Sequence, residues 1–74
     1  MAHNGYKSES SYNLALTLDN THVLYQEAFI ICENYAQGNE SLNDSILFLN
    51  EFLICFGYEE KLEDIKEYIL GHES

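Results

Sequence analysis

The amino-acid sequence predicts an all-α protein, a compact bundle of three to four short helices. We expect one domain over residues 10–74, preceded by a flexible, polar arm at residues 1–9. Apolar side chains recur every three to four residues in successive runs, as on one face of a helix. The chain contains no proline, so nothing forbids long helices. Gly38, Gly57 and Gly71 each follow such a run, where a left-handed C′ glycine commonly ends a helix.

The first run, residues 12–18, fits either of two structures. Large apolar side chains alternate with small or polar ones along it, which is the period of a β-strand. Three of its residues also share one face of a short helix, namely Leu14, Ala15 and Leu18. A lone strand would leave its backbone groups unpaired, because no second strand is evident in the sequence. We therefore predict a helix, and the strand alternative requires two chains to pair their edges in a dimer.

The second and third runs are predicted as helices over residues 22–37 and 42–56. Their core stripes consist of Leu24, Ala28, Ile31 and Tyr35 in the second run and of Leu42, Ile46, Leu49, Leu53 and Phe56 in the third. Both runs also hold apolar residues away from these stripes, among them Val23, Ile30, Leu47 and Phe48. This surplus indicates either a second packing surface or a partner contact. Self-association as a homodimer through Ile30, Leu47 and Phe48 is one alternative.

The fourth run, residues 59–70, has the clearest amphipathic pattern. One face is apolar and consists of Tyr58, Leu62, Ile65 and Ile69. The opposite face carries four acids, which we call the acidic stripe: Glu60, Glu63, Asp64 and Glu67. Like charges four residues apart destabilise a helix, so helix stability does not explain the stripe. It is either a solvated surface or, together with Tyr68, a binding surface for a protein rich in lysine and arginine.

The net charge of the chain restricts its partners. Thirteen carboxylates stand against three lysines and no arginine, which gives a net charge of −10 and a pI of about 4.3. A field of this sign repels nucleic acid and anionic membranes and attracts basic surfaces. We therefore expect a basic, nucleic-acid-binding protein as the partner and no direct binding to nucleic acid or membrane. The polar start of the chain and the lack of a long apolar segment favour a location in the cytoplasm.

The side chains that usually carry catalysis or bind metal form no recognisable motif. His3, His22 and His72 are far apart in the sequence, and no histidine–cysteine cluster has the spacing of a metal site. The serine and glycine motifs of hydrolases and nucleotide-binding proteins are absent. We expect no enzymatic activity, no catalytic residue, no metal ligand and no cofactor. Cys32 and Cys55 lie within apolar runs and are predicted to be buried, reduced thiols.

The N-terminal third of the chain resembles the opening of a group of small phage and mobile-element proteins. The matching residues are Asn4-Gly5-Tyr6-Lys7, then Ser11-Tyr12-Asn13-Leu14-Ala15-Leu16-Thr17-Leu18-Asp19-Asn20, and then Leu24-Tyr25. The group typically begins N-G-Y-K and continues T-W-N-V-A-L-W-L-D-N, so Tyr12 and Thr17 stand where the group has tryptophan. The resemblance implies a small, phage-encoded accessory protein that acts inside the infected cell. Proteins of this kind often inhibit host defence or host enzymes.

Three hypotheses for function follow from these observations. The first is a phage-type inhibitor of a basic, nucleic-acid-handling host protein, acting by anti-CRISPR or anti-restriction activity or by DNA mimicry. The second is a self-associating structural or adaptor module whose charge serves solubility alone. The third is a protein that sequesters a small molecule at a dimer interface. We favour the first because the net charge, the acidic stripe and the resemblance all agree with it.

Overall fold

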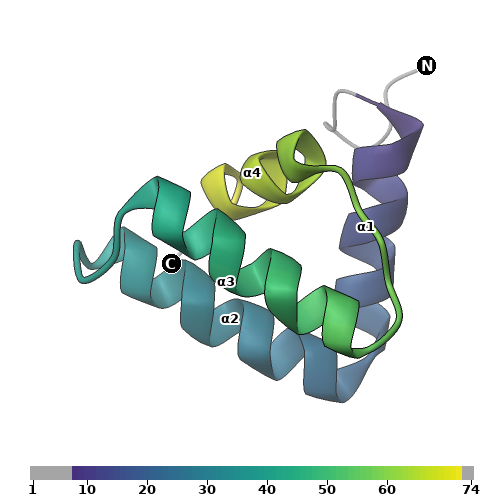
Figure 1. Cartoon of the computed structure of the whole chain (residues 1–74), viewed down its shortest axis with the longest axis horizontal. Coiled ribbons are helices and arrows are strands. Elements are labelled where there is room, and N and C mark those ends of the chain that lie inside the picture. The colour runs from purple at the N-terminus through teal and green to yellow at the C-terminus, as the bar shows by residue number, and fades with distance from the viewer. Residues whose placement is uncertain (1–7, 73–74) are drawn as a thin grey trace.

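The computed structural model describes residues 8–72, and this part of the chain contains four α-helices and no β-strand (Figure 1). The helices are α1 (Glu9–Asn20), α2 (His22–Ala36), α3 (Leu42–Cys55) and α4 (Leu62–Leu70). The prediction of an all-α bundle is confirmed. The first run forms a helix and not a strand, so the alternative of a strand paired between two chains is wrong.

Helix α1 begins with a capping box made by two serines. The Ser11 N–H donates to Ser8 Oγ at 3.2 Å, and the Ser8 N–H donates to Ser11 Oγ at 3.3 Å. These bonds satisfy backbone donors that have no partner within the helix. The helix therefore begins at Glu9, and Ser8 and Glu9 belong to the helix and its cap although we expected them in the flexible arm. The rest of the expected arm, residues 1–7, lies outside the described residues.

Helices α2 and α3 both end at a glycine with a positive φ angle. Gly38 has a φ of 81° and Gly57 a φ of 88°, a region that glycine adopts without a Cβ clash. After α3, the Gly57 N–H donates to the Ile54 carbonyl at 2.9 Å, and the next N–H donates to the Leu53 carbonyl at 2.9 Å. These two bonds make a Schellman motif, which satisfies carbonyls of the last turn. Gly71 also ends a helix, as expected, but as the C-cap residue of α4 with an ordinary helical φ of −84° and not as a left-handed C′ glycine.

The four helices pack in a closed ring, in which α1 and α3 each contact both α2 and α4. Thr21 alone separates α1 from α2, whereas α2 and α3 lie side by side and antiparallel (Figure 1). The core inside the ring consists of Leu14, Leu18, Leu24, Ala28, Cys32, Ile46, Leu49, Leu53, Ile65 and Ile69. Every helix contributes to this core, so the core depends on all four helices being in place.

Candidate functional site

The residues of the acidic stripe are divided between a connecting segment and a helix. Helix α4 begins at Leu62, with Lys61 as its N-cap, although the sequence pattern predicts a start at Glu59. The chain uses residues 58–60 to cross from α3 to α4, and these residues are not helical. Glu60 therefore precedes the helix, whereas the other three acids lie on it.

Asp64 is buried, so the expectation of a fully exposed stripe is wrong. The residue is 6% exposed, and its Oδ2 atom has no hydrogen-bond partner. Leu62, which we expected in the core, is 50% exposed. Successive residues turn by about 100° around a helix, so Asp64 and Leu62 lie on opposite sides of Ile65. The face of α4 that packs on its neighbours therefore extends from Ile65 and Ile69 as far as Asp64, whereas Leu62 is exposed at the first position of the helix, although it lies on nearly the same side as Ile69.

Burial also affects Glu60. Desolvation raises the pKa of its carboxyl group, and the negative charge of Asp64 raises this pKa further. The fold thus brings the carboxylates of Glu60 and Asp64 into electrostatic contact. Glu63 is exposed and Glu67 is half-buried. The four acids consequently have four different environments and do not form one uniform surface.

Tyr68, which we expected beside the stripe as a contact residue, faces α1. Its Oη donates to Asp19 Oδ1 on α1 at 3.3 Å, and its ring packs against the buried core. The position of Tyr68 indicates that it holds α4 against α1.

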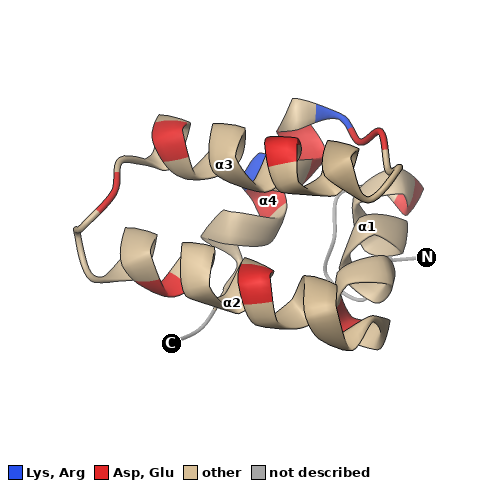
Figure 2. Ribbon diagram, turned by 60° about the horizontal axis from the view of Figure 1, so that its bottom comes forward, with Lys and Arg blue, Asp and Glu red and all other residues tan. Residues whose placement is uncertain are grey.

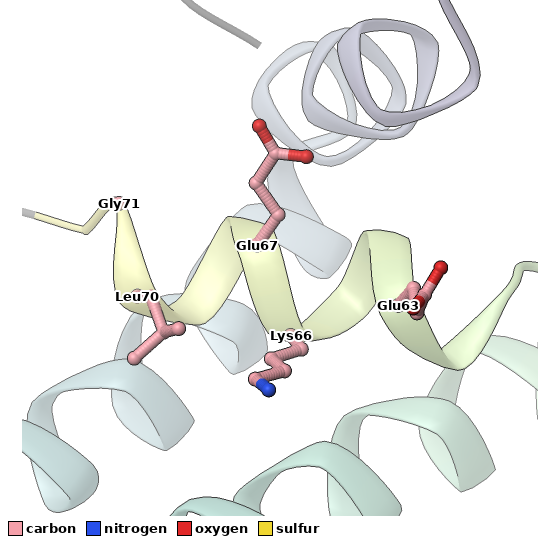
Figure 3. Close-up of a pocket in the computed structure, with 5 residues that line it drawn as sticks. All are labelled: Glu63, Lys66, Glu67, Leu70 and Gly71. Carbon is pink, nitrogen blue, oxygen red and sulfur yellow. The ribbon is translucent and has the colours of Figure 1, made fainter. Parts of the chain in front are cut away.

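An open hollow of about 400 Å³ lies along α4 (Figure 3). It is lined by Glu63, Lys66, Glu67, Leu70 and Gly71. The carboxylate of Glu67 lies on one side of α4, whereas Lys66 and Leu70 point to the other side. The polar groups around this hollow therefore do not converge on a common point, as they do in a ligand site.

Negative charge surrounds the molecule. Carboxylates are present on all four helices and on the segments between α2 and α3 and between α3 and α4 (Figure 2). Within residues 8–72 one ion pair is present, between His72 Nε2 and Glu33 Oε2 at 3.1 Å. The two lysines of this part, Lys61 and Lys66, are exposed and form no ion pair with its carboxylates. Lys61 and Lys66 therefore form no ion pair that would offset the carboxylates of residues 8–72.

The residues predicted for self-association are all on the surface. Ile30 and Phe48 are each 52% exposed, and Leu47 is exposed to a similar degree. Their role in self-association stays a prediction. The structure adds that both Ile30 and Phe48 point away from the core, because each is exposed and lies roughly opposite a fully buried residue of its own helix, Ala28 on α2 and Leu53 on α3.

The α2–α3 hairpin has a buried side and an exposed side. Ala28 on α2 and Leu53 on α3 are fully buried and mark the side that faces the core. The two helices lie side by side, so the flanks that point away from the core, opposite Ala28 and Leu53, form the exposed side of the hairpin. Three large apolar residues occupy that exposed side, which we call the outer face: Val23, Ile30 and Phe48. In Figure 2 the two helices lie in front, with α4 behind them.

The two cysteines differ in exposure. Cys32 is buried, as predicted, and burial together with the charge of Glu33 raises the pKa of its thiol to about 12. Cys55 is exposed at the end of α3, so the prediction of a buried thiol is wrong for this residue. Both cysteines are free.

Within residues 8–72, no group of three or more histidine, cysteine, aspartate or glutamate side chains could hold a metal ion. No helix in the same part of the chain has the length and apolar character needed to cross a membrane. Comparisons with protein-family models, with curated proteins and with solved structures gave no match to this chain. The function is therefore inferred from the surfaces described above.

Proposed function

We propose that this protein is a small acidic accessory protein that binds and inhibits a basic, nucleic-acid-handling protein of a host cell. The observation that carries the proposal is the excess of thirteen carboxylates over three lysines, with acids on every helix. Such a field attracts a basic surface and accelerates its encounter with the chain. The resemblance of the N-terminal third to small phage proteins supports an anti-defence role, such as anti-CRISPR or anti-restriction activity, in the host cytoplasm.

The proposal does not depend on a regular row of carboxylates that imitates the phosphates of DNA. Asp64 is buried and Glu60 is partly desolvated, so these two acids do not support DNA mimicry by the acidic stripe. Attraction to a basic protein requires a large net negative charge on side chains that are exposed to solvent. The acids other than Glu60 and Asp64 provide this charge. Glu51, Glu59 and Glu63 are three of the exposed acids, and their combined replacement tests the contribution of exposed charge.

An infection assay tests the proposed function. Cells that carry a CRISPR or restriction system are infected with phage, with and without expression of this protein. We expect expression to raise the efficiency of plating, and a variant with Glu51, Glu59 and Glu63 changed to glutamine to raise it less. Circular dichroism of the variant controls for folding. An unchanged efficiency of plating with the wild-type chain, across several defence systems, would contradict an anti-defence role.

A second candidate function is a self-associating structural or adaptor module, supported by the exposure of Ile30, Leu47 and Phe48. Analytical ultracentrifugation at micromolar concentration distinguishes the two functions. A stable dimer that Phe48→Asp dissociates, in a chain without effect on infection, would favour the module. The charge of −10 on each chain opposes such a dimer, which is why we place this candidate second.

A further inference from the structure

The outer face of the α2–α3 hairpin is an apolar strip with carboxylates beside its apolar residues. On α3, Asp44 precedes Phe48 by four residues and Glu51 follows it by three, so both acids neighbour Phe48 on the helix surface. On α2, Glu27 lies between Val23 and Ile30 at the same spacing. Asp44 and Glu51 are exposed, and Glu27 is half-buried. The strip therefore offers apolar contacts on both helices, with exposed negative charge beside Phe48 and the half-buried Glu27 between Val23 and Ile30.

The dimensions of the outer face suit a helix. The antiparallel helices α2 and α3, of 15 and 14 residues, give the outer face a length of about 21 Å, since each residue advances a helix by about 1.5 Å. The apolar residues of α2, Val23 and Ile30, are seven residues or about 10 Å apart. An amphipathic helix places its own apolar side chains at intervals of three, four and seven residues, so its spacing matches that of the outer face.

The charge at the edges decides which helix fits. A second copy of this chain would set Glu27, Asp44 and Glu51 against the same acids of its partner, and like charges across an interface oppose association. A helix flanked by lysine or arginine would instead meet these carboxylates with the opposite sign. Charge complementarity therefore favours a basic partner over a second copy.

We propose that the outer face binds an amphipathic, basic helix of about 14 residues that belongs to the partner protein. The apolar side of this helix lies on Ile30 and Phe48, which are the centre of the strip. Its lysine or arginine side chains lie beside Asp44 and Glu51. This inference rests on the proposed function, because it names the surface and the kind of segment through which the basic partner is bound.

A synthetic peptide tests the inference without knowledge of the partner. The probe is a 14-residue amphipathic peptide of leucine and lysine, labelled with a fluorophore, and the control is a scrambled peptide of the same composition. We expect the full chain to bind the amphipathic peptide at least about tenfold more tightly than the scrambled one in an anisotropy titration. Equal affinity for both peptides would overturn the inference, since total charge would then explain the binding.

Variants locate the binding surface. We expect Ile30→Ser and Phe48→Ser each to weaken binding of the amphipathic peptide about tenfold, because each removes an apolar contact from the centre of the strip. Leu70→Ser is the matched control, because Leu70 is 50% exposed but lies on α4. An equal loss in Leu70→Ser, or no loss in the two outer-face variants, would show that the peptide binds elsewhere.

The wild-type chain provides a measurement that does not depend on variant folding. Cys55 is exposed and follows Phe48 by seven residues, so it lies on the same flank of α3. Bound peptide should slow alkylation of Cys55 by N-ethylmaleimide, and unchanged alkylation at saturating peptide would overturn the inference.

If the infection assay succeeds while the outer-face variants keep full activity, the proposed function stands and this surface assignment fails. If infection is unaffected but the peptide protects Cys55, the surface assignment stands and the anti-defence role fails.

Discussion

Replacement of Asp64 by alanine should stabilise the fold, although Asp64 is buried. Its Oδ2 atom is enclosed without a hydrogen-bond partner, and an unsatisfied buried polar group costs about 1–3 kcal/mol. The carboxylate lies in the first turn of α4, where it gains about 0.3–1 kcal/mol from the helix dipole. Alanine removes the larger penalty, loses the smaller gain and is the better helix former. We expect the free energy of unfolding to rise by about 1 kcal/mol relative to the wild-type chain.

Glu63→Ala is the matched control for Asp64→Ala. Glu63 is the preceding residue in the same helical turn, carries the same charge and is exposed. Both variants lose one negative charge and one interaction with the helix dipole, so their difference reports the burial of Asp64. Thermal unfolding followed by circular dichroism should place Asp64→Ala at least about 4–8 °C above Glu63→Ala, because the two variants differ by the burial penalty of about 1–3 kcal/mol and about 1 kcal/mol corresponds to that shift in a domain of this size. An equal or lower melting temperature for Asp64→Ala would refute the argument from the unpaired oxygen.

Three further predictions concern glycine, pH and thiols. Gly57→Ala should lower the free energy of unfolding by about 1 kcal/mol in urea, because its φ of 88° is strained for alanine, whereas Gly71→Ala at a φ of −84° should cost less. The raised pKa of Glu60 means that the folded chain binds this proton more tightly than the unfolded chain. The ionised Glu60 therefore destabilises the fold at pH 7, and this destabilisation is lost as the pH falls toward 4.5. Glu60→Gln has no such carboxyl group, so its urea midpoint should lack the part of the increase at low pH that protonation of Glu60 gives the wild-type chain. Dithiobis-nitrobenzoate at pH 8 should titrate Cys55 alone in the folded chain and Cys32 as well in urea.

The helices were predictable because local signals of two kinds agree. Apolar periodicity located all four runs, and Gly38 and Gly57 marked the ends of α2 and α3. The start of α1 was missed because its capping box uses a serine at the third helical position, Ser11, where glutamate is the usual signal. The start of α4 was missed because amphipathic spacing continues through residues 59–61, which the chain needs for the crossing from α3.

The surface was less predictable than the helices because it depends on tertiary packing. A helical pattern gives the angle between Asp64 and Leu62 but does not show which of them α1 and α3 cover. The sequence also placed Ile30 and Phe48 on separate helices without showing that they share one side of the hairpin. Their equal distance of nine residues from Asn39, in the turn, is the signal that could have placed them at the same level of an antiparallel hairpin, whereas the side on which each lies depends on the rotation of its helix.

The order in which contacts form during folding depends on the closed ring of helices. Three of its four contacts join helices that are neighbours in the chain, and such local contacts form within microseconds to milliseconds. The contact between α1 and α4 joins the two ends of the described chain, so it alone requires the loss of entropy that closes a long loop. We expect the docking of α4 on α1 to limit the folding rate. A chain that ends at Gly57 should then keep helical segments without a fixed tertiary structure, which the loss of near-ultraviolet circular dichroism would reveal.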